Sequence, residues 1–182
     1  MNYLIYSYLF FFLYGTALTG DIWMVNTGSA RFLSDAPLER IEAETKMVKG
    51  ALKLSDRTFA FSIENQTFNG FNSPLQQEHF FENYIETHKF PASTFVGQII
   101  EQVDLSKPGE YDVRAKGKLN IHGVSKERII KVRVISDGQK MNAQSVFSVL
   151  LDEHGIGIPK IVQQKISSEI QVWVNLEFLP KE

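Results

Sequence analysis

The sequence predicts an all-β protein of one domain, and three observations lead to this prediction. Short segments in which apolar and polar residues alternate recur along the chain, and this period of two is typical of half-buried strands. Turn-forming dipeptides separate the segments, for example Pro108-Gly109 and Asp137-Gly138. Hydrophobic residues make up 43% of the 182 residues, which is enough for a single domain with a buried core.

The segment 111–122 shows the alternation most clearly. Val113 and Leu119 share one face with other apolar or small residues, whereas charged and polar side chains occupy the other face. Asp137-Gly138 is typical of a tight two-residue hairpin, so strands that are neighbours in sequence should pair antiparallel. The other segments that we expect to form strands are 30–34, 38–45, 47–54, 58–63, 93–101, 126–135, 139–151 and 169–178.

Eight or nine antiparallel strands can close into a barrel, which leaves no exposed sheet edge. Small residues interrupt the apolar faces at five positions, namely Ala43, Gly50, Gly97, Ala115 and Gly117. Glycines within strands are compatible with bends at barrel corners. Small residues inside a phenylalanine-rich wall are also what an apolar cavity would need. The residues therefore leave two alternatives open, a packed barrel and a barrel with a cavity.

One helix interrupts the series of strands. Ser73 is suited to the N-cap, Pro74 to the first helical position and Gln76 to the third, which is the arrangement of a capping box. The apolar residues that follow recur at helical spacing, and Pro91 cannot continue a helix. These signals predict a helix over about residues 73–88.

Residues 1–20 differ in composition from the rest of the chain, because all 19 basic and 21 acidic residues follow Gly20. Residues 4–13 are apolar over the length of a signal-peptide core and are shorter than the roughly 20 residues of a bilayer-spanning helix. Small residues then suit a cleavage site near 17–20. We expect an export signal, a barrel domain over 21–182 and a periplasmic or secreted protein. An uncleaved anchor and a buried N-terminal element are the alternatives.

The composition excludes several classes of function. A formal net charge of −2 argues against a basic surface that binds nucleic acid. The absence of cysteine excludes a disulfide, a thiol nucleophile, a thiolate metal site and a lipid-modified N-terminus. The sequence has no G-x-S-x-G or S-x-x-K motif for a serine nucleophile and no glycine-rich phosphate loop. We therefore expect no cofactor, no metal and no covalent catalysis.

Two histidines are candidates for a general base, namely His122 at the end of the long strand and His154 beside two acidic residues. We favour a structural role for His122, as a turn residue whose ring fixes the loop that follows. A single imidazole beside carboxylates is a weak metal site. Basic residues also gather on two neighbouring strands, where they form a solvated face or could attract an anionic membrane surface. They are Lys116, Lys118, Lys126, Arg128, Lys131 and Arg133.

Three stretches of the sequence resemble a known family. Residues 77–95 read QEHFFENYIETHKFPASTF, residues 117–126 read GKLNIHGVSK with His122 and Gly123 at the centre, and the third stretch is 158–174. The first is similar to the helix and the K-[YF]-P-x-x-x-F strand entry of the YceI-like family of exported bacterial proteins. The second is similar to its most specific signature, G-x-L-x-I-H-G-V-[TS]-K, and the third to a tail of Bacteroidetes-type members.

The resemblance implies a lipocalin-like, eight-stranded antiparallel barrel with the helix covering one end. It also implies an elongated apolar cavity, which in some members of the family holds a polyisoprenoid or a similar lipid. No catalytic residues are established for the family, so the resemblance assigns none here. Residues 152–158 depart from the D-R-x-x-F-G segment of some members, which leaves open whether this loop contacts the ligand.

Together these observations predict a non-enzymatic protein that binds one long apolar chain by burying it inside the barrel. The predicted wall residues are Phe59, Phe61, Phe95, Val113, Ala115, Leu119, Ile121, Phe147, Val149 and Val174. The predicted lid residues are Phe80, Phe81 and Tyr84. The alternatives are an isomerase or hydrolase at the barrel mouth that uses His122 or His154, and a packed barrel that serves as a stress or interaction module. The identity of the lipid and the oligomeric state stay open.

Overall fold

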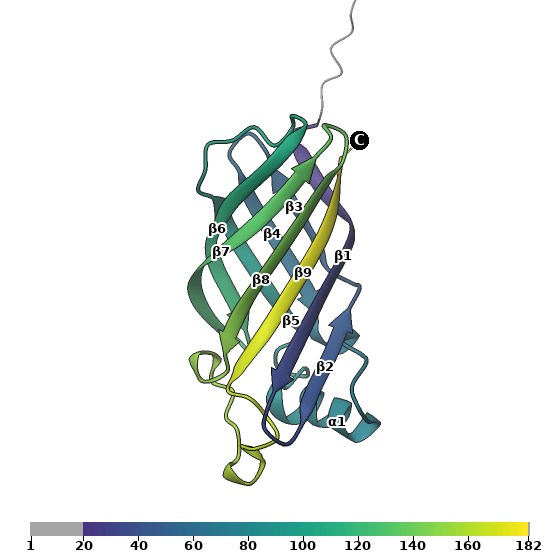
Figure 1. Ribbon diagram of the computed structural model, residues 1–182, viewed down its shortest axis with the longest axis vertical. Helices are drawn as coiled ribbons and strands as arrows, with labels where there is room; N and C mark the ends of the chain where they lie inside the picture. Colours follow the sequence, from purple (N-terminus) through teal and green to yellow (C-terminus); the bar gives the residue numbers. More distant parts are fainter. Residues whose placement is uncertain (1–19, 182) are drawn as a thin grey trace, which may run out of the picture.

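The computed structural model describes residues 20–181, which form a closed antiparallel β-barrel (Figure 1). The predicted export signal therefore lies outside the described residues, apart from Gly20. All nine predicted strands are present. They are β1 (Ile22–Asp35), β2 (Arg40–Thr45), β3 (Lys49–Lys53), β4 (Thr58–Glu64), β5 (Ala92–Ile99), β6 (Gly109–Ile121), β7 (Val124–Ser136), β8 (Met141–Leu150) and β9 (Glu169–Pro180).

Closure of the barrel depends on β1, which pairs along both of its edges. One edge pairs with β9, from Trp23 opposite Pro180 to Leu33 opposite Gln171. The other edge pairs with β3 near the start of β1 and with β2 near its end. β2 and β3 keep one common register against β1, so they form a single strand position that is interrupted at residues 46–48. The ring therefore has eight strand positions, which confirms the predicted eight-stranded antiparallel barrel.

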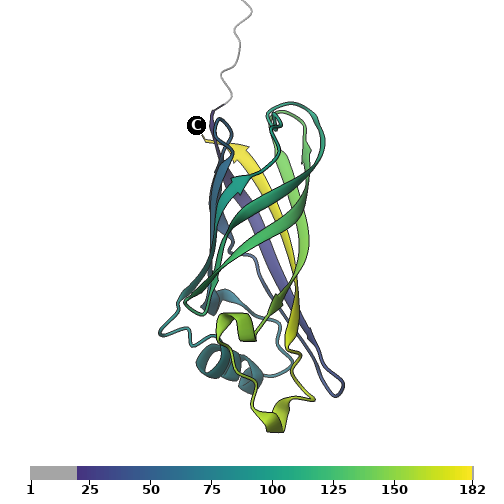
Figure 2. The same ribbon diagram turned by 90° about the vertical axis from the view of Figure 1, so that its left-hand side faces the viewer.

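The connections alternate between the two ends of the barrel (Figures 1 and 2). The upper end in Figure 1 holds both ends of the described chain, and there the Lys181 N–H donates a hydrogen bond to the Ile22 carbonyl oxygen (2.8 Å). The lower end holds the helical segments of the described residues. These are η1 (Asn65–Thr67), α1 (Pro74–His79), the π-helical turn η2 (Phe80–Tyr84), η3 (Asp152–His154) and η4 (Lys160–Val162).

Side chains fill the upper part of the barrel more completely than the lower part. Trp23, Leu105, Met141 and Phe178 come from strand ends and from the β5–β6 loop at the upper end, and each is at most 3% exposed. Inward-facing residues lower in the barrel, such as Phe147, are only half-buried. A side chain that points into a barrel and still keeps accessible surface must border unfilled space. The burial pattern therefore indicates a cavity.

Two glycines allow β5 and β6 to approach each other closely. Gly97 and Gly117 lie directly opposite each other in this strand pair. A Cβ atom on Gly97 would lie 2.1 Å from the Lys116 carbonyl oxygen, and one on Gly117 would lie 2.4 Å from the Val96 carbonyl oxygen. Any side chain at these positions would push the strands apart. Close contact between the two backbones therefore accounts for this pair of glycines.

The β7–β8 pairing is short compared with its neighbours in the ring. The two strands pair only over residues 133–136 and 141–144, and they diverge toward the lower end of the barrel (Figure 1). Arg128 bridges the lower part of this seam. Its guanidinium donates to the Ser148 carbonyl oxygen (2.6 Å) and forms an ion pair with Glu153 (3.2 Å) of η3. The short helical segment after β8 thus takes over part of the contact that the strands do not make.

The helix ends earlier than the predicted residue 88. Ser73 caps it as predicted, because the Gln76 N–H donates to the Ser73 hydroxyl oxygen (3.2 Å). α1 continues into η2, which ends at Tyr84. Glu86 then takes a φ of 48°, in the left-handed region that a right-handed helix does not contain.

The prediction of a two-residue turn at Asp137-Gly138 is wrong, because the observed connection is longer. These residues lie in the longer connection 137–140 between β7 and β8, where the Asp137 side chain accepts hydrogen bonds from the backbone of its own loop. The two-residue turn is His122-Gly123, between β6 and β7. Its φ angles of 52° and 74° are the positive pair that a type I′ turn requires.

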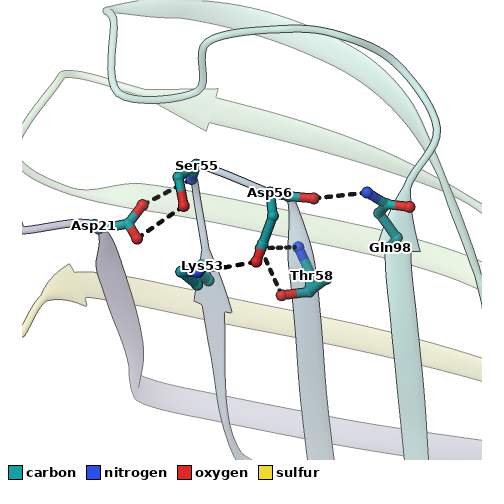
Figure 3. A network of polar contacts seen from close by, with 6 residues as sticks. All are labelled: Asp21, Lys53, Ser55, Asp56, Thr58 and Gln98. Carbon is teal, nitrogen blue, oxygen red and sulfur yellow. Dashed lines mark hydrogen bonds and ion pairs between the residues drawn. The ribbon is translucent and has the colours of Figure 1, made fainter.

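A polar network holds the start of β1 against the β3–β4 turn at the upper end (Figure 3). The Asp21 carboxylate accepts hydrogen bonds from the N–H (2.7 Å) and the hydroxyl (2.9 Å) of Ser55. Asp56 accepts a hydrogen bond from the Thr58 hydroxyl (2.6 Å) and pairs with Lys53 (3.0 Å). The network therefore fixes the turn on both sides.

We predict that Asp56 stabilises the protein above about pH 4 and that this contribution disappears in stronger acid. Hydrogen bonds from Thr58, followed by the bond from Lys53, lower the pKa of the Asp56 carboxyl from 3.8 to about 2. A carboxyl whose pKa is lower in the folded state stabilises that state above the unfolded pKa, and the stabilisation is lost as the pH falls to the folded pKa. Urea titrations should show that Asp56→Asn lowers the free energy of unfolding near pH 5, with a difference that shrinks toward about pH 2.

Asp112→Asn is the matched control for this experiment. Asp112 is exposed on β6, and no other described residue donates a hydrogen bond to its carboxylate, so the change should have little effect at either pH. A loss for Asp56→Asn that stays constant or grows as the pH falls would contradict the prediction.

Candidate functional site

The unfilled space inside the barrel is a cavity of about 570 Å³. This volume lies within the range of small-molecule sites, about 300–1,000 Å³. Met141 and Phe178 border it at the upper end, and Leu75 and Val162 border it at the lower end. Most of the lining is aliphatic or aromatic. The site can therefore accept an apolar molecule, whose transfer out of water is favourable.

All ten predicted wall residues line this cavity, and their contact with a ligand stays a prediction. Their side chains point inward because each lies on the apolar face of an alternating strand. β4 contributes two phenylalanines, β6 contributes four residues, and β5, β8 and β9 contribute the others. The residues are Phe59, Phe61, Phe95, Val113, Ala115, Leu119, Ile121, Phe147, Val149 and Val174.

An aromatic cluster lies beneath the cavity, between the barrel and α1. The centroid of the Phe80 ring lies 5.2 Å from that of Phe32, 5.9 Å from that of Phe68 and 5.1 Å from that of Phe71. All four residues line the cavity. The sequence did not identify Phe68 and Phe71 as wall residues, because they lie in the loop before α1, where no periodicity marks an inward face. Phe32 does lie on a predicted strand, and its alternation with Ala30 is the signal that could have identified it.

Two of the three predicted lid residues occupy the expected place. Phe80 and Tyr84 line the cavity from η2, and burial raises the pKa of the Tyr84 hydroxyl. Phe81 does not line it, and its ring instead contacts Phe71 (6.2 Å) and Phe80 (5.6 Å). Adjacent residues on a helical turn point in different directions, so the two phenylalanines cannot both face the cavity.

The cavity opens at the lower end of the barrel. Leu75, His79 and Lys165 line it and are also exposed to solvent. The Gln76 side-chain amide donates to Glu39 Oε1 (2.9 Å), which joins α1 to the β1–β2 hairpin at this opening. The opening therefore combines an apolar interior with polar groups at its edge, as small-molecule sites commonly do.

His122 and Gly123 form the β6–β7 turn and do not line the cavity. His122 Nδ1 lies 3.1 Å from the His154 carbonyl oxygen, and Nε2 lies 2.8 Å from Glu86 Oε2. The His122 ring packs edge-on against Phe90 at 4.5 Å, and a Cβ on Gly123 would lie 2.4 Å from the same Phe90 ring. His122 is thus a turn residue as predicted, but its bonds reach two distant segments rather than its own loop.

Both nitrogens of the His122 ring lie within hydrogen-bond distance of oxygen atoms, one on the His154 backbone and one on the Glu86 carboxylate. Lys89, followed by His122, lowers the pKa of the Glu86 carboxyl through hydrogen bonds, which keeps the acceptor charged. Both ring nitrogens are therefore engaged by contacts within the protein. The His122 ring therefore serves to fasten the segment before β5 and the segment after β8 to the barrel.

His154 is the most buried histidine of the described residues, at 1% exposure. Its Nδ1 lies 3.1 Å from the Val124 carbonyl oxygen, so this nitrogen donates a hydrogen bond. Its Nε2 is buried without a hydrogen-bond partner, and the residue does not line the cavity. The two histidines considered as a general base at the barrel mouth thus both lie outside the cavity wall.

The basic residues of β6 and β7 do not share one face, because Lys116, Lys118, Lys131 and Arg133 are exposed on the outer face whereas Arg128 lies opposite Gly117 on the other side and is half-buried. Arg133 pairs with Glu110, and Arg128 pairs with Glu153 of η3. Within residues 20–181, no group of three or more histidine, aspartate and glutamate side chains could hold a metal ion. In the same part of the chain, no helix has both the length and the apolar character needed to cross a membrane.

A family model described as the YceI-like domain matches residues 25–178, which is most of the chain. The chain belongs to the YceI-like family. All three stretches that carry the resemblance lie within this match. No curated protein sequence matches the chain.

Solved structures of other proteins share the YceI-like fold. A polyisoprenoid-binding domain from Saccharophagus degradans, implicated in plant cell wall breakdown, has a TM-score of 0.76 at 12% identity, over 87% of this chain and 98% of that one. BcnA from Burkholderia cenocepacia has a TM-score of 0.68 at 16% identity, over 82% and 95%. The YceI protein from Campylobacter jejuni has a TM-score of 0.56 at 14% identity, over 100% and 99%. At these identities the likeness shows a common fold.

We predict that His122→Ala destabilises the protein by about 1–3 kcal/mol, because it leaves the His154 carbonyl oxygen without its donor and removes a partner of Glu86. Urea denaturation followed by circular dichroism measures this loss. His88→Ala is the control, since His88 is exposed and its loss should cost less than about 0.5 kcal/mol. Equal stability of the two variants would show that the His122 contacts do not fasten the lower end.

Proposed function

We propose that the protein binds one long apolar chain, a polyisoprenoid or a similar lipid, inside the barrel. The observation that carries this proposal is the cavity of about 570 Å³, which has an apolar wall and an opening at the lower end. Each methylene group that leaves water for such a wall contributes roughly 0.8 kcal/mol. A long hydrocarbon chain therefore gains more from this site than a short one does.

The family and the fold support the same class of ligand. The chain is a YceI-like protein, and a domain with this fold from Saccharophagus degradans is described as polyisoprenoid-binding. The elongated interior between Met141 and Leu75 suits a linear molecule whose tail lies deep and whose polar end stays near the opening. His79 and Lys165 line that opening and supply polar groups for a head group.

A binding function is favoured over the two alternatives. An enzyme at the barrel mouth would need His122 or His154 to reach the substrate, and both rings lie outside the cavity wall. A packed barrel that serves only as an interaction module would need no internal space, and the cavity argues against it. We therefore propose a non-enzymatic role in which the protein holds and transfers a lipid.

We further propose that residues 1–20 direct export and are removed, so that the protein acts in the periplasm or outside the cell. Their uncharged, apolar composition supports this proposal, since an export signal needs an apolar core and a small-residue cleavage site. Intact-mass measurement of the protein recovered outside the cytoplasm should give a chain that begins near residues 17–20. A full-length mass in the cytoplasmic fraction would contradict export.

Filling the cavity should abolish lipid uptake without unfolding the barrel. Val174 points into the cavity and is only half-buried, so we expect Val174→Trp to occupy the space of the ligand. Its uptake of geranylgeraniol should fall by at least about tenfold, which corresponds to about 1.4 kcal/mol. Uptake is measured as lipid that remains with the protein after gel filtration, quantified by mass spectrometry.

Val146→Trp is the matched control, because Val146 lies on the adjacent strand β8 and is 57% exposed. This variant should take up as much geranylgeraniol as the wild type. Circular dichroism should show the same strand content in all three proteins. Undiminished uptake by a folded Val174→Trp variant, or no uptake by the wild type, would refute binding inside the barrel.

A further inference from the structure

Three large apolar side chains are exposed together around the opening of the cavity. Ile161 in η4 is 92% exposed, Leu38 in the β1–β2 connection is 66% exposed, and Leu75 in α1 is 59% exposed. We propose that these three residues form a docking surface by which the protein places its opening against an anionic lipid bilayer. We refer to them together as the apolar rim.

Hydrogen bonds bring the three segments of the apolar rim to one place. The Leu38 N–H donates to the Gln164 carbonyl oxygen (2.8 Å), which joins the β1–β2 connection to the segment after η4. The Gln76 side chain donates to Glu39 (2.9 Å), which joins α1 to the same connection. Figures 1 and 2 show the β1–β2 hairpin, α1 and the β8–β9 segment together at the lower end.

The apolar rim is continuous with the cavity. Leu75 itself lines the cavity, and so do Val162 and Lys165, which lie close in sequence to Ile161. A chain that leaves the barrel at this end would therefore pass directly between the rim residues. If the rim is inserted into a bilayer, the lipid can move between membrane and cavity without crossing water.

The charge of residues 155–168, the part of the β8–β9 segment that contains Ile161, suits an anionic surface. Residues 155–168 contain two lysines, Lys160 and Lys165, and no carboxylate. Both lysines are exposed and flank Ile161. Lysines beside an inserted apolar residue can extend to the phosphate groups while their methylene stems stay in the interface.

A bilayer fits the apolar rim better than a second copy of the chain does. The rim consists of three side chains on three separate segments, whereas a stable protein interface buries about 800 Å² on each partner over a continuous surface. Single apolar side chains can insert between lipid head groups without a complementary surface. This inference rests on the proposed lipid-binding function, which explains why the opening should face a membrane.

The test is vesicle flotation of the purified protein, with the wild type and its variants carrying the same N-terminal residues. Vesicles of phosphatidylcholine mixed with phosphatidylglycerol are compared with vesicles of phosphatidylcholine alone, and no isoprenoid is added. We expect Ile161→Ser to reduce partitioning into the anionic vesicles by at least about tenfold. Lys160→Gln should reduce it by roughly fivefold and have little effect on neutral vesicles.

Ile129→Ser is the matched control, because Ile129 is 57% exposed on the outer face of β7, away from the opening. It should float like the wild type. Equal flotation of Ile161→Ser and the wild type, or flotation lost only in Ile129→Ser, would overturn the proposal. A shift to dimers in sedimentation velocity that Ile161→Ser abolishes, with no flotation of the wild type, would assign the apolar rim to a second copy and also overturn it.

Uptake of geranylgeraniol from solution separates this proposal from the proposed function. Ile161 does not line the cavity, so Ile161→Ser should take up the lipid as the wild type does. A wild type that floats with vesicles but takes up no lipid would contradict the proposed function and leave the docking surface intact. A wild type that takes up lipid but does not float would contradict the docking surface alone.

Discussion

The structure depends throughout on the pairing of β1 with other strands along both of its edges. Because β9 occupies one edge and β2 with β3 the other, the sheet closes and its inner face becomes an enclosed space. Eight strand positions give a barrel whose interior can be filled by side chains or can hold one small ligand. The volume of the inward-facing side chains decides between these outcomes. Here Trp23 and Met141 fill the upper end, while the residues lower in the barrel leave a cavity.

The lower end therefore carries both the opening and the contacts that keep its loops in place. Two residues of the family signature act in these contacts rather than in the cavity wall: His122 reaches Glu86 and His154, and Gly123 leaves room for the Phe90 ring. Phe90 belongs to the stretch that leads into β5, so two family motifs meet each other here. These residues hold the segment before β5 and the segment after β8 against the barrel. This role explains how a motif can be specific to a family without supplying a catalytic group.

Alternation was sufficient to predict all or part of each strand and the inward faces that hold the ten wall residues, because a strand that faces a core on one side must alternate. It missed the first eight residues of β1, Ile22 to Ser29, and the eight-stranded barrel with a cavity was predicted from the family resemblance. The helix start was also predictable, since Ser73 and Pro74 act locally. The early end of the helix was not, because no glycine marks the left-handed position at Glu86, whose side chain contacts His122 far along the chain. The same limit applies to the loop residues Phe68 and Phe71, whose inward direction is set by packing against Phe80. The β7–β8 seam was not predicted either, although β7 loses its alternation at residues 125–130, within the part of the strand that does not pair with β8.

We propose that the barrel interior is a site for one apolar chain rather than an incompletely packed core. Native mass spectrometry of the protein, purified from cells without added lipid and without detergent exchange, tests it most directly. We expect a species whose mass exceeds that of the chain by one long-chain lipid, which organic extraction removes. A single species with the mass of the bare chain, unchanged after incubation with isoprenoid-containing membranes, would contradict it.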